Sequence, residues 1–453
     1  MGFAETLTAL ADAVCGYPLF AMLIGGGLYL FVSSGAVSLR RLPDAIAALR
    51  RNRSEGSSDG QISSFQALMS VIAATVGMGN IAGVAIALVV GGPGAIFWMW
   101  VSALVGMATK YHEGVLSQLY RGRNAAGEPQ GGTMHIIEQS TGRRGHWMAR
   151  LFAVAGLFGT LCIINANQLT EALLSALASG SVDDPATRLA VGLAIAATVA
   201  LVVVGGIRRI ARVASLLVPF MVAVYFAMVA WVLASHFSAI PGAFASIFTE
   251  AFSLDAGLGA LAGVAITGAR RAALVNEAGV GTASIMHGAS RGSSPVNEGL
   301  IAMLGPAIDS GLVCTLTALA IMLGCDITQA EGIRGLSVAM TAFGSSVPGG
   351  RWLLLFVVAC FALSSMFSYS FYGNRCAAYL FGESRARYYT WFFIATLVIF
   401  AVIPLSAAVS LCDLFFALMV FPTMATLLRL SGVVRRHTAL YFNSRKLPSN
   451  VHS

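Results

Sequence analysis

The sequence predicts an all-α polytopic membrane protein with about eleven transmembrane helices, and three observations support this fold class. Of the 453 residues, 57% are hydrophobic and only 11% are charged, whereas a soluble domain carries about 25% charged residues. Apolar runs of about 20 residues, the length that crosses a bilayer core as a helix, recur along the chain. The basic residues gather in alternate gaps between these runs. This composition excludes most soluble enzymes, coiled coils and disordered chains.

Eleven apolar runs are candidate spans. They cover residues 16–38, 64–90, 94–119, 147–178, 188–205, 211–234, 255–275, 298–323, 351–372, 388–404 and 407–429. The first run is too long for a secretion signal, and its basic cluster follows it rather than precedes it. The runs that exceed 25 residues are expected to tilt or to extend beyond the membrane.

The positions of the basic residues predict the orientation. The net charge of +8 suggests nucleic acid only while those positions are ignored. We count 24 of the 28 Lys and Arg residues in or at the edges of the gaps that follow odd-numbered spans and in the C-terminal segment. Basic residues accumulate on the cytoplasmic side of membranes, so the N-terminus is expected outside and the C-terminus in the cytoplasm. A lipid- or nucleic-acid-binding patch at Arg50, Arg51 and Arg53 is the less favoured alternative.

The spans also predict the domain organisation. The polar segments 39–63, 120–146 and 432–453 are too short to bury a soluble core. The stretch 324–350 mixes apolar residues with glycine-rich ends, which suits short helices that cap an outer vestibule. The expected units are an extracellular N-terminus with an extra helix (1–38), a cytoplasmic linker (39–63), two five-helix repeats (64–234 and 255–430) and a cytoplasmic tail (431–453).

A glycine-rich stretch in the second span is the first candidate site. Gly77 and Gly79, followed by Asn80, permit the helix to unwind mid-span, where only a cavity-facing break is tolerated. Unwinding exposes amides that bind a carboxylate and carbonyls that bind Na⁺. The alternative is a small-residue packing face formed by Gly79 and Gly83. A dinucleotide-binding loop fits poorly, because no strand precedes the glycines.

The seventh span is also rich in glycine, at Gly257, Gly259, Gly263 and Gly268 and again near Gly279. A second broken span five positions after the first fits two repeats, spans two to six and seven to eleven. Because five is odd, the second repeat would be inverted relative to the first. The first span remains as an extra helix.

Polar residues inside other spans form a second tier of candidates. They are Asn165 and Asn167 in the fourth span and Ser364, Ser365, Ser368, Tyr369 and Ser370 in the ninth. Hydroxyls and carbonyls suit a hard cation such as Na⁺, although a single Ser in a helix usually bonds to its own backbone.

Charged residues inside the spans are few. Asp309 lies near the middle of the eighth span, where a charge is costly. We expect it to pair with a helix break or to serve as a proton-coupling acid. Lys110 and Glu113 are one turn apart and predict an interfacial ion pair.

Enzyme signatures are missing from the sequence. Seven cysteines without a CxxC pattern indicate neither a disulfide framework nor a zinc site. His112 and Glu113 are not followed by a second His at the spacing of a zinc protease. His287 is interpreted as structural. We therefore predict neither an enzyme nor a cofactor.

Five stretches of the sequence closely resemble the alanine/glycine:cation symporter family. They are residues 73–84 (AATVGMGNIAGV), 91–100 (GGPGAIFWMW), 106–111 (GMATKY), 276–281 (NEAGVG) and 299–305 (GLIAMLG) with Ile308-Asp309. The likeness extends from about residue 16 to residue 430. It implies a LeuT-type fold, in which a ten-helix inverted repeat of the 5+5 kind carries one additional N-terminal helix. It also implies Na⁺-coupled uptake of a small neutral amino acid, with H⁺ as the coupling ion in some members.

The resemblance also implies roles for individual residues. By position, the substrate would bind Gly77, Met78, Gly79 and Asn80 on the unwound second span, completed by Asn165 and Tyr369. The Na⁺ site would use carbonyls near Ala73 and Val76 and the hydroxyls of Ser364 and Ser365. Asn276 and Glu277 belong to the family's Asn-Glu-Ala-Gly signature, a gating or packing motif.

Several positions depart from the family pattern. Met78 replaces the usual Thr of Gly-Thr-Gly-Asn, Asn165 replaces Gln, Tyr369 replaces Trp, and Gly373-Asn374 replaces Gly-Glu. One methylene in a pocket is worth roughly 1–3 kcal/mol. These changes therefore predict a substrate that need not be alanine or glycine.

Taken together, the sequence predicts a symporter in a prokaryotic cytoplasmic membrane that works by alternating access. Na⁺ is the expected coupling ion and a small neutral amino acid the expected substrate, with no nucleic-acid partner. The alternatives are an H⁺-coupled amino acid transporter of different preference and, less favoured, an ion channel.

Overall fold

The computed structural model of this chain describes Val14 and residues 17–52, 62–124, 127–177, 184–253, 258–291, 294–325, 335–402 and 405–444. These residues are almost entirely helical, as predicted. The helices are α2 (Tyr17–Phe20), η1 (Ala21–Gly25), α3 (Gly26–Ser33), α4 (Val37–Arg40), α5 (Leu42–Asn52), α6 (Ser64–Thr75), η2 (Gly79–Gly83), α7 (Val84–Gly91), α8 (Gly94–Leu119), α9 (Thr133–Thr141), η3 (Gly142–Gly145), α10 (His146–Gly159), α11 (Ile163–Leu177), α12 (Pro185–Val203), α13 (Gly206–Ser235), η4 (Phe237–Ala239), α14 (Ile240–Ala251), α15 (Leu258–Asn276), α16 (Thr282–Gly288), α17 (Pro295–Ala302), α18 (Leu304–Pro306), η5 (Ala307–Val313), α19 (Cys314–Gly324), α20 (Gly335–Ser346), α21 (Gly350–Phe381), α22 (Glu383–Val402) and α23 (Leu405–Ser444).

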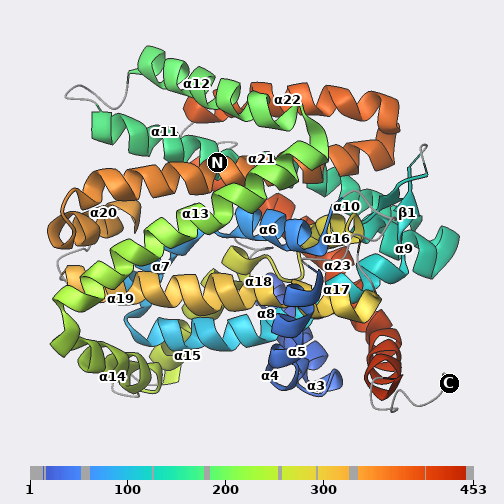
Figure 1. Ribbon diagram of the computed structural model, residues 1–453, viewed down its shortest axis with the longest axis horizontal. Coiled ribbons are helices and arrows are strands. Elements are labelled where there is room, and N and C mark those ends of the chain that lie inside the picture. Colours follow the sequence, from blue (N-terminus) through green and yellow to red (C-terminus); the bar gives the residue numbers. More distant parts are fainter. Residues whose placement is uncertain are drawn as a thin grey trace.

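The long helices lie side by side across the molecule (Figure 1). Helices α12 and α22 pack together at the top of that view, and α8 and α15 pack together toward the bottom. The strands β1 (Gly122–Arg123) and β2 (Pro129–Gln130) pair antiparallel as a short hairpin near α9.

Six helical stretches of the described chain are long and apolar enough to cross a membrane. They are Thr133–Ala176, Pro185–Val203, Gly206–Ser235, Pro295–Gly324, Gly350–Phe381 and Leu414–Ser444. A seventh candidate is the pair Ser64–Thr75 and Gly79–Gly91, bent by 55°. Helices also occupy the other predicted spans, at Tyr17–Ser33, α8, α15 and α22. The apolar helices fit a membrane protein, and the count of eleven crossings stays a prediction.

Local sequence signals account for the starts of two helices. Ser63 and Gln66 form a capping box at the start of α6, with each side chain bonded to the other residue's backbone amide, at 3.1 Å and 3.0 Å. Asp184 caps α12, and Pro185 follows it at the first helical position. Hydrogen bonds from the Thr187 hydroxyl and amide lower the pKa of the Asp184 carboxyl, which lies outside the span.

The helices pack in two groups, one around α8 and one around α10, and α6 contacts both. Helix α8 packs against α15, α16 and α17, while α10 packs against α21 and α23. Close approach explains Gly114 on α8, because a Cβ there would lie 2.9 Å from the Cα of Gly299 on α17. Helix α6 contacts α16 and α17 of the first group and α13 and α21 beside the second. The broken helix α6–η2–α7 therefore lies where the two groups meet.

The predicted seventh span contains two groups of glycines, and its break does not lie in the first group, at 259–268. Helix α15 continues through Gly259, Gly263 and Gly268 and ends at Asn276, whereas Gly257 lies outside the described residues. One glycine costs a helix only about 1 kcal/mol. At Gly268, a Cβ would lie 2.2 Å from the Ala95 carbonyl oxygen, so this glycine permits helix contact.

The chain leaves helical geometry at Glu277–Gly281 instead. Glu277, Gly279 and Gly281 have φ values of 51°, 90° and 92°, in the left-handed region that glycine adopts readily and other residues rarely. The Asn276 carboxamide stabilises this turn by accepting a hydrogen bond from the Ala278 amide at 3.0 Å. The second helix break therefore coincides with the Asn-Glu-Ala-Gly-Val-Gly motif.

The predicted fourth span lies within the candidate span Thr133–Ala176, which has a local break between α10 and α11, where Cys162 has a φ of 54°. One prediction about charged residues needs correction. Lys110 and Glu113 are not interfacial: both side chains are fully buried. Helix α8 is covered by α15 and α17 at these positions, which removes them from water.

The structure describes only parts of the polar segments. Within 324–350, the predicted short helix is present as α20, which packs against α7 and η2, while residues 326–334 lie outside the described ranges. Helix α14 was not predicted as a separate element. Most of the N-terminal segment before Tyr17, Arg53, and the tail residues 445–453 also lie outside the described residues.

Candidate transport site

A cavity of about 620 Å³ lies where the helix breaks meet. It is lined by Gly77, Met78 and Gly79 from the first break, by Glu277 from the second, and by Cys162 beside Asn165 from the α10–α11 interruption. Tyr369 and Ser365 of α21 complete it. The structure thus brings together five of the six residues predicted to contact substrate. The sixth, Asn80, is described below.

The first break has a defined backbone geometry. Helix α6 ends at Thr75, Val76 is extended with φ −74° and ψ 93°, and the wide π-helical turn η2 follows. The predicted unwinding of the second span is confirmed as a bend. Gly77 packs tightly against α21, because a Cβ there would lie 3.0 Å from the Ser365 hydroxyl oxygen. Backbone in this region therefore approaches both the cavity and α21 closely.

Asn80 lies behind the cavity and does not line it. Its carboxamide oxygen accepts a hydrogen bond from the Gly77 amide at 2.9 Å. Its nitrogen donates to the Asp309 carboxylate and lies 3.5 Å from the Cys314 sulfur. Asp309 is fully buried in another π-helical turn, η5. Asp309 is thus paired with a helix break, and direct contact of Asn80 with substrate stays a prediction.

Five oxygen atoms converge between α6 and α21, and we call them the oxygen cluster. The Ser365 hydroxyl lies 3.1 Å from the carbonyl oxygens of Ala73 and Ala74 and 3.0 Å from that of Phe361. The Ser364 hydroxyl lies 3.2 Å from the Ala73 oxygen and 2.9 Å from the Phe361 oxygen. Neutral oxygens of this kind suit a hard monovalent cation, because each hydroxyl can turn a lone pair toward it.

The oxygen cluster matches the predicted cation site only in part. Ala73, Ser364 and Ser365 are brought together, whereas neither hydroxyl forms a hydrogen bond with Val76 in the described part of the chain. Ala74 and Phe361 were missed by the sequence analysis. Phe361 could have been found from spacing, since a Ser in a helix commonly bonds to the carbonyl three or four residues earlier.

Two charged side chains reach the cavity, Glu277 and Arg271. Glu277 also accepts a hydrogen bond from the Thr282 hydroxyl at 2.8 Å. Asn276 instead shapes the break through its bond to Ala278. Arg271 and Gln168 were missed, although Gln168 lies three residues after Asn165 and therefore on the same helical face. The cavity can thus bind a ligand that carries an ammonium, a carboxylate and amide groups.

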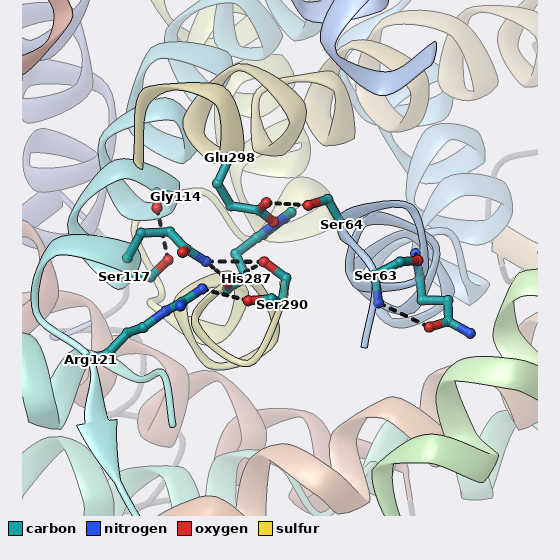
Figure 2. A network of polar contacts seen from close by, with 10 residues as sticks. Ser63, Ser64, Gly114, Ser117, Arg121, His287, Ser290 and Glu298 are labelled. Atoms are coloured by element: carbon teal, nitrogen blue, oxygen red, sulfur yellow. Dashed lines mark hydrogen bonds and ion pairs between the residues drawn. The ribbon is translucent and has the colours of Figure 1, made fainter. Parts of the chain in front are cut away.

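A polar network connects the start of α6, the end away from the first break, to neighbouring helices (Figure 2). His287 Nδ1 lies 2.6 Å from one Glu298 carboxylate oxygen, and the Ser64 hydroxyl donates to the other at 2.6 Å. Arg121 donates to the Ser290 carbonyl, and Gln118 donates to the Ser290 hydroxyl at 3.0 Å. Figure 2 shows Glu298 between Ser64 and His287, with Arg121 and Ser290 beside them.

This network, which we call the His287–Glu298 network, joins the start of α6 to α8, α16 and α17. At about 1.5 Å per residue, Ser64 lies roughly 16 Å from the end of α6 at Thr75. A backbone hydrogen bond strengthens this connection, since the Arg291 amide donates to the Ile62 carbonyl at 2.8 Å. The sequence analysis interpreted His287 as structural and gave no signal for its partner. The contact depends on tertiary packing.

Comparison with known proteins supplies a family. A sequence model of the sodium:alanine symporter family matches residues 2–452. The sodium/alanine symporter AgcS of Methanococcus maripaludis is 36% identical over 98% of this chain and 99% of its own length. The probable sodium/glutamine symporter GlnT of Bacillus subtilis is 31% identical over 92% of this chain and 86% of its own length.

A solved structure shows the same fold. The crystal structure of MhsT in complex with L-phenylalanine superposes with a TM-score of 0.56 at 15% identity, covering 84% of this chain and 89% of that one. The likeness supports a LeuT-like arrangement of helices. AgcS spans nearly the same length as this chain.

Proposed function

We propose that this chain, which belongs to the sodium:alanine symporter family and is therefore a membrane transporter rather than an enzyme, imports a small neutral amino acid together with Na⁺. The observation that carries the proposal is the oxygen cluster directly beside the cavity. Ser365 belongs to both, because its hydroxyl bonds to α6 carbonyls while its side chain lines the cavity. Occupancy of one site can therefore influence the other.

The substrate would lie across the helix breaks. Its carboxylate would approach the backbone at Gly77–Gly79, where the chain leaves helical geometry and helix η2 begins. Its ammonium would face Glu277, the acid that lines the cavity. Asn165 and Tyr369 would contact the side chain. The first two assignments use the carboxylate and ammonium groups that every amino acid shares. The remaining lining residues would then decide which side chain is accepted.

Na⁺ would act by stabilising one conformation. Binding shifts a conformational equilibrium only by its differential affinity for the two states. A cation at the oxygen cluster would hold α6 against α21 and thereby assemble the cavity. The His287–Glu298 network closes the α6 end that lies on the predicted cytoplasmic side. Alternating access would require this network to open after the cavity closes.

The proposed topology completes this account. Eleven crossings, two inverted repeats of five helices and an additional N-terminal helix would place the N-terminus outside and the C-terminus in the cytoplasm of a prokaryotic cell. A helix break in each proposed repeat, within α6–η2–α7 and between α15 and α16, supports this arrangement.

The substrate need not be alanine or glycine. Tyr369 adds a hydroxyl to the cavity where the family usually has Trp, and Asn165 is one methylene shorter than Gln. A cavity of about 620 Å³ also exceeds the need of an alanine molecule. We expect a neutral amino acid with a larger or more polar side chain to be the better substrate.

A panel of labelled neutral amino acids tests this function. Purified protein in liposomes is given each compound with Na⁺ outside, or with choline outside as control. The proposal predicts saturable uptake that depends on Na⁺ and favours a substrate larger than alanine. Uptake of none of the panel in Na⁺ would contradict the function, and a preference for alanine or glycine would contradict only the altered specificity.

A further inference from the structure

A second cavity, of about 400 Å³, lies apart from the transport cavity. It is lined by the turn between α12 and α13, the second half of α21, the first half of α22 and the segment that carries the β1–β2 hairpin. Helices α12, α21 and α22 pack against one another and lie together in the upper part of Figure 1. Of the described residues, none lines both cavities. We call the second cavity the α21–α22 pocket.

The α21–α22 pocket lies at the face that the basic residues predict to be cytoplasmic. Its lining comes from the gaps after the third, fifth and ninth predicted spans and from the span ends beside them. Two apolar residues of the lining are exposed, Val204 at 56% and Trp391 at 60%. Trp is enriched at the headgroup level of membranes. The pocket is therefore expected to open toward lipid headgroups.

The wall of the pocket has an apolar part and a polar part. The apolar part consists of Val203, Val204, Ile207, Ile210 and Phe371. The polar part includes Asn374, Arg375, Arg387 and Thr390. A ligand that joins a hydrocarbon chain to a polar group would match both parts.

Positive charge predominates around the pocket. The starts of α13 and α22 and the second half of α21 carry one acid, Glu383, and six arginines, which are Arg208, Arg209, Arg212, Arg375, Arg385 and Arg387. The hairpin adds Arg123 and Glu128, one residue of each sign. The preference of basic residues for the cytoplasmic side accounts for this excess, but it does not account for a pocket among them.

Two arginines of the lining retain bonding capacity. Arg387 donates a hydrogen bond to the neighbouring Tyr388 hydroxyl at 3.2 Å and forms no ion pair with any described residue. Arg375 pairs with Glu383 at 3.0 Å, while its Nε is buried without a hydrogen-bond partner among the described residues. A guanidinium group presents several N–H donors in a geometry that matches phosphate. An oxyanion in the pocket would therefore find unused donors.

A hydroxyl group adds a neutral donor beside Arg387. The Asn374 carboxamide donates a hydrogen bond to the Thr390 hydroxyl oxygen at 3.2 Å. Because Thr390 is the acceptor in that bond, its own proton remains for another acceptor. Thr390 and Arg387 are three residues apart on α22 and therefore lie on the same face of the helix. Together they offer an anion one charged and one neutral donor.

The two acids of the pocket already have partners. Glu383 accepts hydrogen bonds from Arg375 and Gln130, and a Glu128 oxygen lies 3.7 Å from the Arg208 guanidinium. A cationic ligand would have to replace these contacts against the excess of arginine. A soluble phosphate would leave the apolar part of the wall uncovered. An anion that carries hydrocarbon fits both the charge and the wall.

We propose that the α21–α22 pocket binds the headgroup of an anionic phospholipid from the cytoplasmic leaflet. The phosphodiester oxygens accept hydrogen bonds from the Arg387 guanidinium and the Thr390 hydroxyl. The hydrocarbon next to the headgroup covers Val204 and the rest of the apolar wall. The pocket reaches Phe371, two residues after Tyr369 of the transport cavity, so the bound lipid contacts the same helix as the substrate.

Lipid binding to the purified protein tests the site. Native mass spectrometry of the full chain in a neutral detergent counts bound lipids while phosphatidylglycerol is titrated, and phosphatidylethanolamine is titrated in parallel. The wild type is expected to bind phosphatidylglycerol at least about tenfold more tightly, since each arginine near an anionic lipid contributes roughly fivefold. Both titrations are made without substrate and without Na⁺.

Two variants separate the contribution of charge from that of space. Arg387→Gln removes the guanidinium, and Val204→Trp fills the pocket without changing its charge. Each should weaken phosphatidylglycerol binding roughly tenfold, as loss of a charge-assisted contact does, and both positions are exposed, so folding should be retained. Arg385→Gln and Leu201→Trp are the matched controls, because these exposed residues lie two and three positions earlier and do not line the pocket. Both controls should bind the lipid like the wild type.

Equal weakening by Arg385→Gln and Arg387→Gln would overturn the proposal, because general positive charge would then attract the lipid. Unchanged binding in both Arg387→Gln and Val204→Trp would also overturn it, as would equal binding of the two lipids by the wild type. Displacement of phosphatidylglycerol by an equal concentration of glycerol 3-phosphate would show that the pocket takes a soluble phosphate ester instead. Because no substrate is present, failure of the lipid site would leave the transport function standing.

Discussion

The hydroxyl group of Ser365 donates toward the carbonyl oxygen of Ala73 at 3.1 Å, although the two residues are 292 positions apart in the sequence. The contact joins the end of α6, where the first helix break begins, to the middle of α21. Three carbonyls and two hydroxyls therefore meet at the wall of the cavity. This arrangement supports our assignment of the cation site, from which the first prediction follows.

Ser365→Ala is expected to weaken Na⁺ activation of transport by roughly tenfold or more. Hydrogen bonds and ligands to charged groups contribute about 1.5–3 kcal/mol each, and the substitution removes one oxygen from the cluster. The measurement is the Na⁺ concentration at half-maximal uptake. Ser370→Ala is the matched control on α21, because the Ser370 hydroxyl bonds only locally, to the Phe367 carbonyl at 2.7 Å. Unaltered Na⁺ dependence in Ser365→Ala would show that the cation binds elsewhere.

Tyr369→Trp and Asn165→Gln should shift selectivity toward smaller amino acids. Both substitutions introduce the residue that the family usually has and reduce the space in the cavity. A change of one methylene is worth roughly 1–3 kcal/mol, so the ratio of kcat/KM for alanine to that for the preferred substrate should rise about tenfold or more. Competition uptake with the same panel measures the ratio. If neither variant changes it, these positions do not select the substrate.

Asn80→Ala should destabilise the protein more than Asp309→Asn does. Removing the Asn80 carboxamide leaves the buried Asp309 without this donor, which costs about 1–3 kcal/mol or more for a charged group. Asparagine at position 309 retains an oxygen that accepts the same bond. Thermal unfolding in detergent gives the two Tm values. Equal Tm values would indicate that this contact does not brace the first break.

Glu298→Ala should loosen the start of α6. Loss of one partner of a buried pair costs about 3–5 kcal/mol, here because His287 and Ser64 both lose their acceptor. Hydrogen exchange of the amides of α6 is the measurement, and faster exchange near Ser64 is expected. Glu138→Gln serves as the control, because this partly exposed acid pairs with His146 and not with α6. Unchanged exchange would mean that the His287–Glu298 network does not hold α6 closed.

Much of the fold follows from patterns that are local in the sequence. Apolar runs predict where the long helices lie, since burial in lipid demands them, and Gly77-Met78-Gly79 predicts the first break. The second break was harder to place. Gly259 and Gly263 remain helical in α15 because a single glycine destabilises a helix only slightly. The turn at Glu277–Gly281, by contrast, has a positive φ at every second residue. Spacing alone does not distinguish these cases.

The residues of the site also fall into those that local sequence predicts and those that it does not. Ser364, Ser365 and Tyr369 lie on one helix and could be predicted as a group, as could the glycines at the first break. Asn80 could not be placed, because its Asp309 partner is 229 residues away. His287 and Glu298 are 11 residues apart, a distance that becomes a contact only after α16 and α17 fold back on each other. Contacts of this kind depend on tertiary packing and leave no periodic signal.

Accumulation of a neutral amino acid against its own gradient is the most direct test of the central claim, that a cation held between α6 and α21 drives import. Liposomes containing the purified protein receive an inward Na⁺ gradient with labelled substrate at equal concentration on both sides. The account predicts that internal substrate rises above the external concentration and returns to equality when monensin collapses the Na⁺ gradient. Internal substrate that never exceeds the external concentration, or that accumulates equally with choline in place of Na⁺, would contradict it.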